Sequence, residues 1–335
     1  LDGAEALKRA GLKPVVLSSK EGLILLSGTT SVTAFASLAI YDAQTLSLTA
    51  DIAGSFTLEV LKGTLMAMDE RLMAVRPHPD QINTAANIRA ILKDSPMLER
   101  YRGHRVQDAL SIRCMPQLHG PVKKAVKDAQ ATLAIELNSS VDNPLIFDEE
   151  DGGAVALMGC NADGTYAGMA SDNLCIAITD LCKMSNSRID RLLNSLVSEL
   201  PAFLNKNADF NNGLMMIQYA SAGLQGELRI LAHPAVVDNL TTCANQEDYV
   251  NMGYNAAKKA YDSMHLAKYI LAAELICDGQ ALDCYEDKRC AKGTQAIYDL
   301  LRSQVPQKQN PMRRTPYLAA VAQQILDREN IRTLE

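Results

Sequence analysis

Apolar residues recur at helical spacing along nearly the whole chain. A first such stretch begins at the S-S-K-E box of residues 18–21 and continues to about residue 75, where R-P-H-P-D ends it because proline removes a backbone donor. A short helix before it ends at Gly11. Further helix-period segments fall at 81–93, 117–138, 167–198, 211–232, 240–278, 293–303 and 316–328. Helices of this length, rich in Ala, Leu and Met, are typical of a bundle.

One segment has the pattern of strands instead. Residues 145–158 consist of two short apolar arms on either side of an acidic turn that contains two glycines, which predicts a β-hairpin. The chain shows neither internal repeats nor low-complexity linkers. We therefore expect an all-α fold, a long-helix bundle with one small β-hairpin, in which residues 1–335 form one continuous helical region.

Residues 22–41 contain no charged side chain and reach the length of a membrane span. Six hydroxyl side chains interrupt this run, namely Ser27, Thr29, Thr30, Ser31, Thr33 and Ser37. That is too many hydroxyls for a helix that faces lipid, so we expect neighbouring helices to bury the segment on all sides. The prediction is a core helix with no membrane as partner.

The charge balance and the cysteines narrow the class of function. With 33 Lys+Arg against 39 Asp+Glu the formal net charge is −6, and no basic block could follow a phosphate backbone, so we expect no nucleic-acid partner. The cysteines form no C-x-x-C pair and the histidines no H-x-x-x-H or H-E-x-x-H pair, which argues against a disulfide framework and against a metal site. A reducing, cytoplasmic location fits these cysteines best.

A few polar residues interrupt apolar, helix-like segments. Gln107 and Arg113 lie in R-V-Q-D-A-L-S-I-R-C, residues 105–114, and Asn161 follows the predicted hairpin. An arginine among apolar neighbours needs a carboxylate, and either a protein side chain or a ligand can supply it. Residues 245–248, N-Q-E-D, lie inside a predicted helix, so at least one faces inward unless the segment is a solvated helix start. The pattern alone leaves both alternatives open.

Six motifs occur in order along the chain. They are K-E-G-L-I-L-L-S-G-T-T (20–30), R-P-H-P-D-Q (76–81), R-V-Q-D-A-L-S-I-R-C-M-P-Q (105–117), E-L-N-S-S-V-D-N-P-L-I (136–146), G-C-N-A-D-G (159–164) and N-Q-E-D-Y-V-N-M-G (245–253). Together they resemble the aromatic amino acid ammonia-lyase family, which includes histidine, phenylalanine and tyrosine ammonia-lyases and aminomutases. The resemblance is closest to histidine ammonia-lyase. It implies a helical homotetramer of the aspartase and fumarase type, in which several chains contribute to each active site.

The resemblance also implies a chemistry. The family removes ammonia and a β-proton from an α-amino acid, with an electrophilic methylidene-imidazolone that forms from an internal Ala-Ser-Gly. No Ala-Ser-Gly occurs in the 335 residues. In the family that triplet and a tyrosine base lie upstream of the region that this chain matches. We therefore expect the group on an N-terminal segment or on a separate subunit, with no cofactor carried by this chain, unless the reaction does without the electrophile.

Site residues follow from the same resemblance. Arg113 matches the family's arginine that pairs with the substrate carboxylate, Gln107 its active-site glutamine, and Glu247 a glutamate typical of histidine ammonia-lyases. We expect these three to be catalytic, and a carboxylate at Glu247 favours a histidine-like substrate. Asn161 and Gln246 are expected to contact the substrate.

Three positions depart from the family pattern. Ser27 stands in place of an asparagine that touches the electrophile, Leu110 in place of a tyrosine, and Ala162 in place of a phenylalanine. Leucine can neither donate a hydrogen bond nor carry a proton. We still count Ser27 and Leu110 as substrate-binding positions, but their side chains indicate an altered substrate or an altered chemistry. Residues 142–144, D-N-P, are expected to shape a turn.

The leading hypothesis is a cytoplasmic carbon-nitrogen lyase that eliminates ammonia from an aromatic, histidine-like α-amino acid and needs an N-terminal partner segment. A second hypothesis keeps the lyase but drops the methylidene-imidazolone, with a better amine as the leaving group. A third is a non-catalytic helical subunit that supports an active partner.

Overall fold

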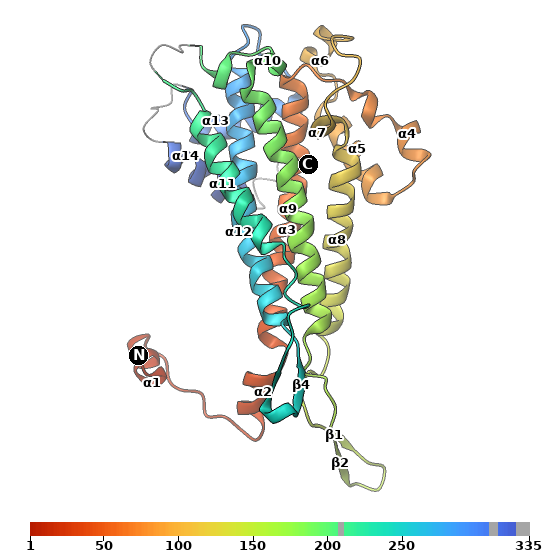
Figure 1. Ribbon diagram of the computed structural model, residues 1–335, viewed down its shortest axis with the longest axis vertical. Coiled ribbons are helices and arrows are strands. Elements are labelled where there is room, and N and C mark those ends of the chain that lie inside the picture. The colour runs from red at the N-terminus through yellow and green to blue at the C-terminus, as the bar shows by residue number, and fades with distance from the viewer. Residues whose placement is uncertain (207–210, 308–313, 326–335) are drawn as a thin grey trace.

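The computed structural model describes residues 1–206, 211–307 and 314–325, and long helices dominate it (Figure 1). The bundle consists of α3 (Thr30–Val60), α8 (Met115–Glu136), α9 (Thr165–Leu193), α11 (Met215–Leu231) and α12 (Gly253–Leu282). Within it, α12 packs against both α9 and α3 over most of its length. The predicted all-α class is therefore confirmed.

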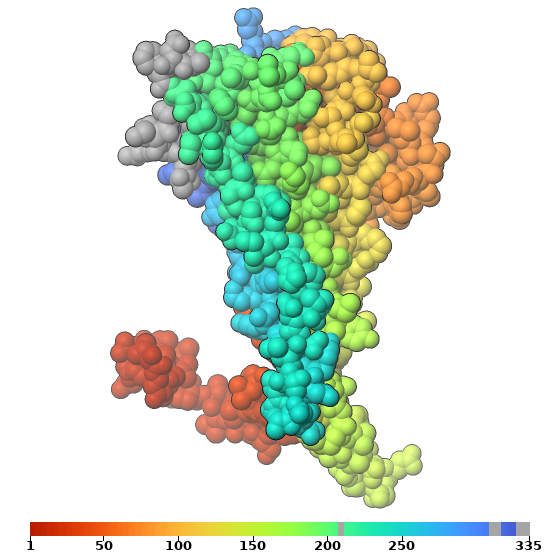
Figure 2. Space-filling model, in the orientation of Figure 1, coloured from red at the N-terminus to blue at the C-terminus, as the bar shows by residue number. Residues whose placement is uncertain are grey.

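Shorter helices pack against this bundle or lie beyond its ends (Figure 1). They are α1 (Gly3–Arg9), α2 (Glu21–Ser27), α4 (Glu70–Ala74), α5 (Pro79–Ile91), α6 (Pro96–Arg100), α7 (Leu110–Arg113), α10 (Ser195–Ser198), α13 (Lys292–Gln304), α14 (Arg314–Ile325) and the 3-10 turns η1 (Leu65–Met68), η2 (Ala202–Leu204) and η3 (Cys243–Asn245). Helix α1 buries none of its residues and lies apart from the bundle (Figure 2).

The helical stretch predicted from residues 18–21 to about residue 75 begins as expected, with α2 at Glu21, but it is broken and its long part ends early. It breaks at Gly28, whose backbone is extended and so close to the Val141 carbonyl that a β-carbon would lie 3.1 Å from its oxygen. It ends at Val60, before η1 and α4. The predicted burial of residues 22–41 on all sides was wrong, since Leu26 of α2 is 86% exposed and Leu38 and Tyr41 of α3 are 53% and 48% exposed. From Ala43 to its end at Val60, helix α3 has no exposed residue. In the described part of the chain no single helix has the length and hydropathy of a membrane span, whereas α2 and α3, bent by 49°, pass that test as a pair.

The predicted hairpin is confirmed, and a second one replaces a predicted helix. Strands β1 (Leu145–Asp148) and β2 (Ala154–Leu157) pair antiparallel, with Leu145 opposite Leu157. Strands β3 (Leu240–Thr242) and β4 (Glu247–Val250) also pair antiparallel, so the helix expected from residue 240 begins only at Gly253. Between them three non-glycine residues adopt positive φ angles of 50°, 54° and 70°, namely Cys243, Ala244 and Asn245.

The core lies where α3, α9 and α12 meet, and it combines small apolar residues with buried charge. Between α3 and α8, the Asp51 carboxylate lies 2.8 Å from Nδ1 of His119 and 2.5 Å from Nζ of Lys123. Burial opposes the charge of Asp51, but these two partners outweigh it and hold the pKa of that carboxyl below its usual value. Burial lowers the pKa of His119, so the ring is neutral and donates its Nδ1 proton to Asp51.

Candidate active site

Arg113 and Gln107 lie together at the upper end of the bundle in Figure 1, on α7 and on the loop before it. Nη1 of Arg113 donates to Oε1 of Gln107 over 2.7 Å. Nε of Arg113 is buried and has no hydrogen-bond partner, and no carboxylate of the described chain forms an ion pair with this guanidinium. The side-chain amide of Gln107 therefore holds the Arg113 guanidinium in place, and other donors of the guanidinium remain for another acceptor.

The loop that carries Gln107 is fixed on both sides. Nε of Arg105 donates to the Leu61 carbonyl over 3.3 Å, and Nη2 to the Val197 carbonyl over 3.2 Å. Asp108 is buried and accepts a hydrogen bond of 2.8 Å from the Thr64 amide, while burial raises the pKa of its carboxyl. These contacts join residues 105–108 to the end of α3 and to α10.

The surface around Arg113 is open. Gln107 is exposed, and Leu110, one helical turn before Arg113, is 61% exposed. Leucine has no polar atom, so this position can offer a ligand only apolar contact. Gln107, Leu110 and Arg113 thus form one cluster, which is called here the upper group.

The other named residues lie at the opposite end of the bundle. Ser27 ends α2, Asn161 follows β2, and Gln246 and Glu247 lie at the tip of the β3–β4 hairpin, all of them exposed (Figure 1). They are called here the lower group. Helix α9 starts at Thr165, close to Asn161 in the sequence, and contacts α7 through Arg188 near its other end. At 1.5 Å per helical residue, this stretch of α9 separates the two groups by about 35 Å. One copy of this chain cannot bring the two groups together.

Local contacts fix the segments of the lower group. Asp142 pairs with Lys20 over 2.6 Å, and Oδ1 of Asn143 accepts from the Gly159 amide over 2.9 Å, so these residues shape a turn as expected. A β-carbon on Gly253 would lie 2.7 Å from the carbonyl oxygen of Gly164, which shows how closely the end of the 159–164 motif meets the start of α12.

Both alternatives for residues 245–248 assumed a helix, and both were wrong. These residues lie on the exposed hairpin, and Oε2 of Glu247 accepts from the Thr242 hydroxyl over 2.9 Å. The carboxylate keeps its other oxygen for a further partner, but Glu247 is exposed and no described segment of its own chain encloses it.

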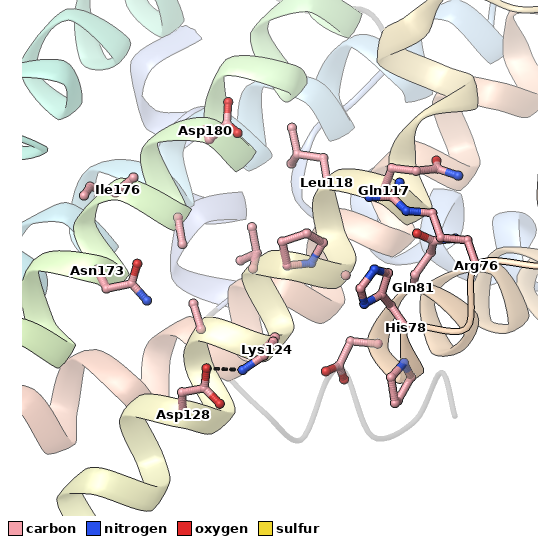
Figure 3. A pocket seen from close by; sticks show the side chains of 17 residues that line it. Arg76, His78, Gln81, Gln117, Leu118, Lys124, Asp128, Asn173, Ile176 and Asp180 are labelled. Carbon is pink, nitrogen blue, oxygen red and sulfur yellow. Dashed lines mark hydrogen bonds and ion pairs between the residues drawn. The ribbon is translucent and has the colours of Figure 1, made fainter. Parts of the chain in front are cut away.

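A hollow of about 630 Å³ lies between the start of α5, α8 and α9, and no role had been predicted for it (Figure 3). Arg76, His78 and Gln117 line one side, and Oε1 of Gln117 is buried without a partner. These residues belong to the motifs 76–81 and 105–117, which in the sequence were only signs of the family resemblance. Within the described residues no group of three or more His, Cys, Asp or Glu side chains could hold a metal ion.

The chain is similar to known proteins along most of its length. The family model described as Aromatic amino acid lyase matches residues 1–303. The chain belongs to this family. It is 42% identical over 309 residues to the histidine ammonia-lyase of Alkaliphilus oremlandii, covering 92% of this chain and 60% of that protein. It is 40% identical over 335 residues to the histidine ammonia-lyase of Symbiobacterium thermophilum, covering 100% of this chain and 66% of that protein.

Solved structures of the family share the fold. The histidine ammonia-lyase of Trypanosoma cruzi superposes with a TM-score of 0.89 at 32% identity, covering 100% of this chain and 63% of that one. The ergothioneine-degrading enzyme ergothionase of Treponema denticola gives 0.85 at 25% identity, covering 97% and 65%. The chain thus spans about 60% of the length of the first of the curated relatives that it matches.

Proposed function

We propose that this chain forms the carboxylate-binding part of a carbon-nitrogen lyase that eliminates ammonia from an aromatic, histidine-like α-amino acid. The observation that carries the proposal is the guanidinium of Arg113, which has a buried Nε without a partner and no carboxylate of the described chain paired with it. A planar fork of this kind matches the carboxylate of an α-amino acid. Membership of the aromatic amino acid lyase family supports this reading of the fork.

The upper group would hold the acid end of the substrate. Arg113 binds the carboxylate, and Gln107, by accepting from Nη1, fixes the plane of the guanidinium. Leu110 lies on the same short helix and gives the substrate an apolar contact. The lower group would meet the other end, with Glu247 at the imidazole or the departing amine and with Asn161, Gln246 and Ser27 orienting the substrate.

Two groups so far apart form one site only if different copies supply them. We therefore propose a homo-oligomer, most simply the family's tetramer, in which the upper group of one copy faces the lower group of another. Large apolar side chains exposed on neighbouring helices support such contacts, namely Tyr166, Met169 and Ile176 on α9 and Tyr219 and Ile230 on α11. A cytoplasmic location, with neither nucleic acid nor membrane as partner, remains part of the proposal.

This chain does not supply the residues of the methylidene-imidazolone. No Ala-Ser-Gly occurs in it, and Ser27 and Ala162 depart from the family residues expected near that group. We place the group on an N-terminal segment or subunit of the complete enzyme, where it would provide the electrophile. No step of the proposal depends on it.

A second candidate is a lyase that works without the electrophile on a substrate with a better amine leaving group. The apolar Leu110 and the departures at Ser27 and Ala162 favour it, as does the fold shared with an enzyme that degrades ergothioneine. An active preparation that lacks the family's near-ultraviolet absorbance would select this candidate. An active preparation that shows the absorbance would select the first.

The variant Arg113→Ala tests the proposal in the complete enzyme. We expect kcat/KM to fall by at least about 100-fold, because the substrate carboxylate loses its charged partner. Arg71→Ala is the matched control, since Arg71 is exposed and pairs with the neighbouring Asp69, and it should change kcat/KM by less than about twofold. Turnover by Arg113→Ala within about twofold of wild type would refute the carboxylate role.

A further inference from the structure

Directly beneath α7, the bundle encloses a charged cluster in which every side chain is fully buried. Arg188 of α9 and Glu274 and Asp278 of α12 are each 0% exposed. Nη2 of Arg188 donates to Oε2 of Glu274 over 3.0 Å, and its Nε donates to the other oxygen of the same carboxylate. The Thr57 hydroxyl of α3 lies 2.9 Å from Oε1 of Glu274 and 2.7 Å from Oδ1 of Asp278.

Proton counting fixes the charge of this cluster. The Thr57 hydroxyl has one proton and cannot donate to both acids, so one acid must bring a proton of its own. Burial, and after it the charge of Glu274, raises the pKa of Asp278 well above its usual value. Asp278 is therefore neutral and donates to Thr57, which donates to Glu274. The charge of Glu274 then balances that of Arg188, as a buried pair requires.

The third nitrogen of the Arg188 guanidinium forms a hydrogen bond outside the cluster. Nη1 of Arg188 donates to the backbone carbonyl of Ser111 over 3.2 Å. Ser111 lies in the four-residue helix α7, two positions before Arg113, and Ile112 between them is buried in the core. Space for this arrangement comes from Gly54, where a β-carbon would lie 3.5 Å from Cζ of Arg188 and only 2.2 Å from Sδ of Met115.

We infer that Arg188 is a positioning residue, which fastens α7 to α9 and α12 and thereby sets the aim of the Arg113 guanidinium at the substrate carboxylate. The inference rests on the proposed role of Arg113. A helix of four residues has too few internal hydrogen bonds to hold its own orientation. Three donors in one rigid plane reach Glu274 and Ser111 at once, whereas the single nitrogen of a lysine cannot.

A merely structural role predicts something different. Buried ion pairs add little net stability, and apolar side chains of similar volume often replace them without loss. A purely structural Arg188 would therefore affect substrate binding only as far as it affects folding. A positioning Arg188 affects the recognition of the carboxylate specifically.

The test compares two probes that differ in one group, in the complete enzyme. Imidazole-4-propionate has the ring and a carboxylate, and 4-ethylimidazole has the same ring without it, so the ratio of their dissociation constants by calorimetry measures carboxylate discrimination. We expect Arg188→Lys to reduce this ratio by at least about tenfold, because a shift of α7 misdirects Arg113. Binding of 4-ethylimidazole should change by less than about twofold.

The control is Asp51→Asn, which disrupts another buried charged cluster, whose ion-pair partners His119 and Lys123 lie on α8. It should lower Tm by several degrees and leave the ratio unchanged. The inference would be overturned if the ratio of dissociation constants fell in both Arg188→Lys and Asp51→Asn in proportion to the loss of Tm. It would also be overturned if the ratio fell in neither variant. If Arg188→Lys does not fold, the double variant Arg188→Met/Glu274→Met removes the Ser111 bond without leaving a buried charge, and the same ratio decides.

Arg113→Ala separates the two claims. If it keeps the wild-type ratio, the proposed function fails, and the inference that depends on it fails too. If Arg113→Ala removes the discrimination between the two probes while Arg188→Lys keeps the wild-type ratio, Arg113 binds the carboxylate and only the positioning role of Arg188 is wrong.

Discussion

Asp278 shows how a single residue couples the charge of the core to the stability of the fold. Its pKa is raised in the folded protein, mainly by burial, so it stays protonated while an unfolded aspartate ionises above about pH 3.9. Unfolding therefore releases a proton, and the contribution of Asp278 to stability is complete at low pH. It declines as pH rises from about 3.9 toward the folded pKa, at up to about 1.4 kcal/mol per pH unit.

The variant Asp278→Asn should reverse that decline. Asparagine keeps a donor for the Thr57 hydroxyl and has no proton to lose. We expect its Tm relative to wild type to increase steadily between pH 4 and pH 7, which thermal unfolding at a series of pH values will measure. Asp262→Asn is the control, because Asp262 lies on the surface of the same helix and pairs with Lys258. A difference in Tm that does not depend on pH would show that Asp278 is ionised in the fold.

At the scale of elements, glycines mark where helices approach most closely. A β-carbon on Gly168 of α9 would lie 2.9 Å from the α-carbon of Gly253 on α12, whereas one on Gly223 of α11 would meet nothing within 4 Å. We expect Gly168→Ala to lower the free energy of unfolding by about 1–3 kcal/mol through a backbone clash. Gly223→Ala should raise it by about 0.5–1 kcal/mol, because alanine favours a helix. Denaturant unfolding of both variants checks the pair, and equal effects would contradict the packing.

The sequence predicts these elements only as far as their signals are local. The α8, α9 and α13 regions have a continuous helical period, and their predicted bounds agree with the structure to within a few residues. The β3–β4 hairpin was missed because Cys243, Ala244 and Asn245 make its turn with positive φ and no glycine. The break at Gly28 was missed because Gly28 lies close to the carbonyl of Val141, more than a hundred residues away, and no local pattern encodes that contact.

At the scale of the whole molecule, the sequence indicated the members of the candidate site but not their arrangement. Gln107 and Arg113 are six residues apart in one motif, and their hydrogen bond could be anticipated. The contacts of Arg188 could not be anticipated, because its partners come from α7 and α12, far from it in the sequence. That the upper and lower groups lie at opposite ends of the bundle follows only from the course of α9, which no motif encodes.

In the proposed active site, the upper group of one copy and the lower group of another form a single site. The most direct measurement is the activity of hybrids assembled from equal amounts of Arg113→Ala and Glu247→Ala chains of the complete enzyme, each variant being inactive alone. Random mixing leaves about a quarter of the sites with both residues intact when different copies supply them. We predict that about a quarter of wild-type activity returns. Hybrids as inactive as either parent would contradict the account.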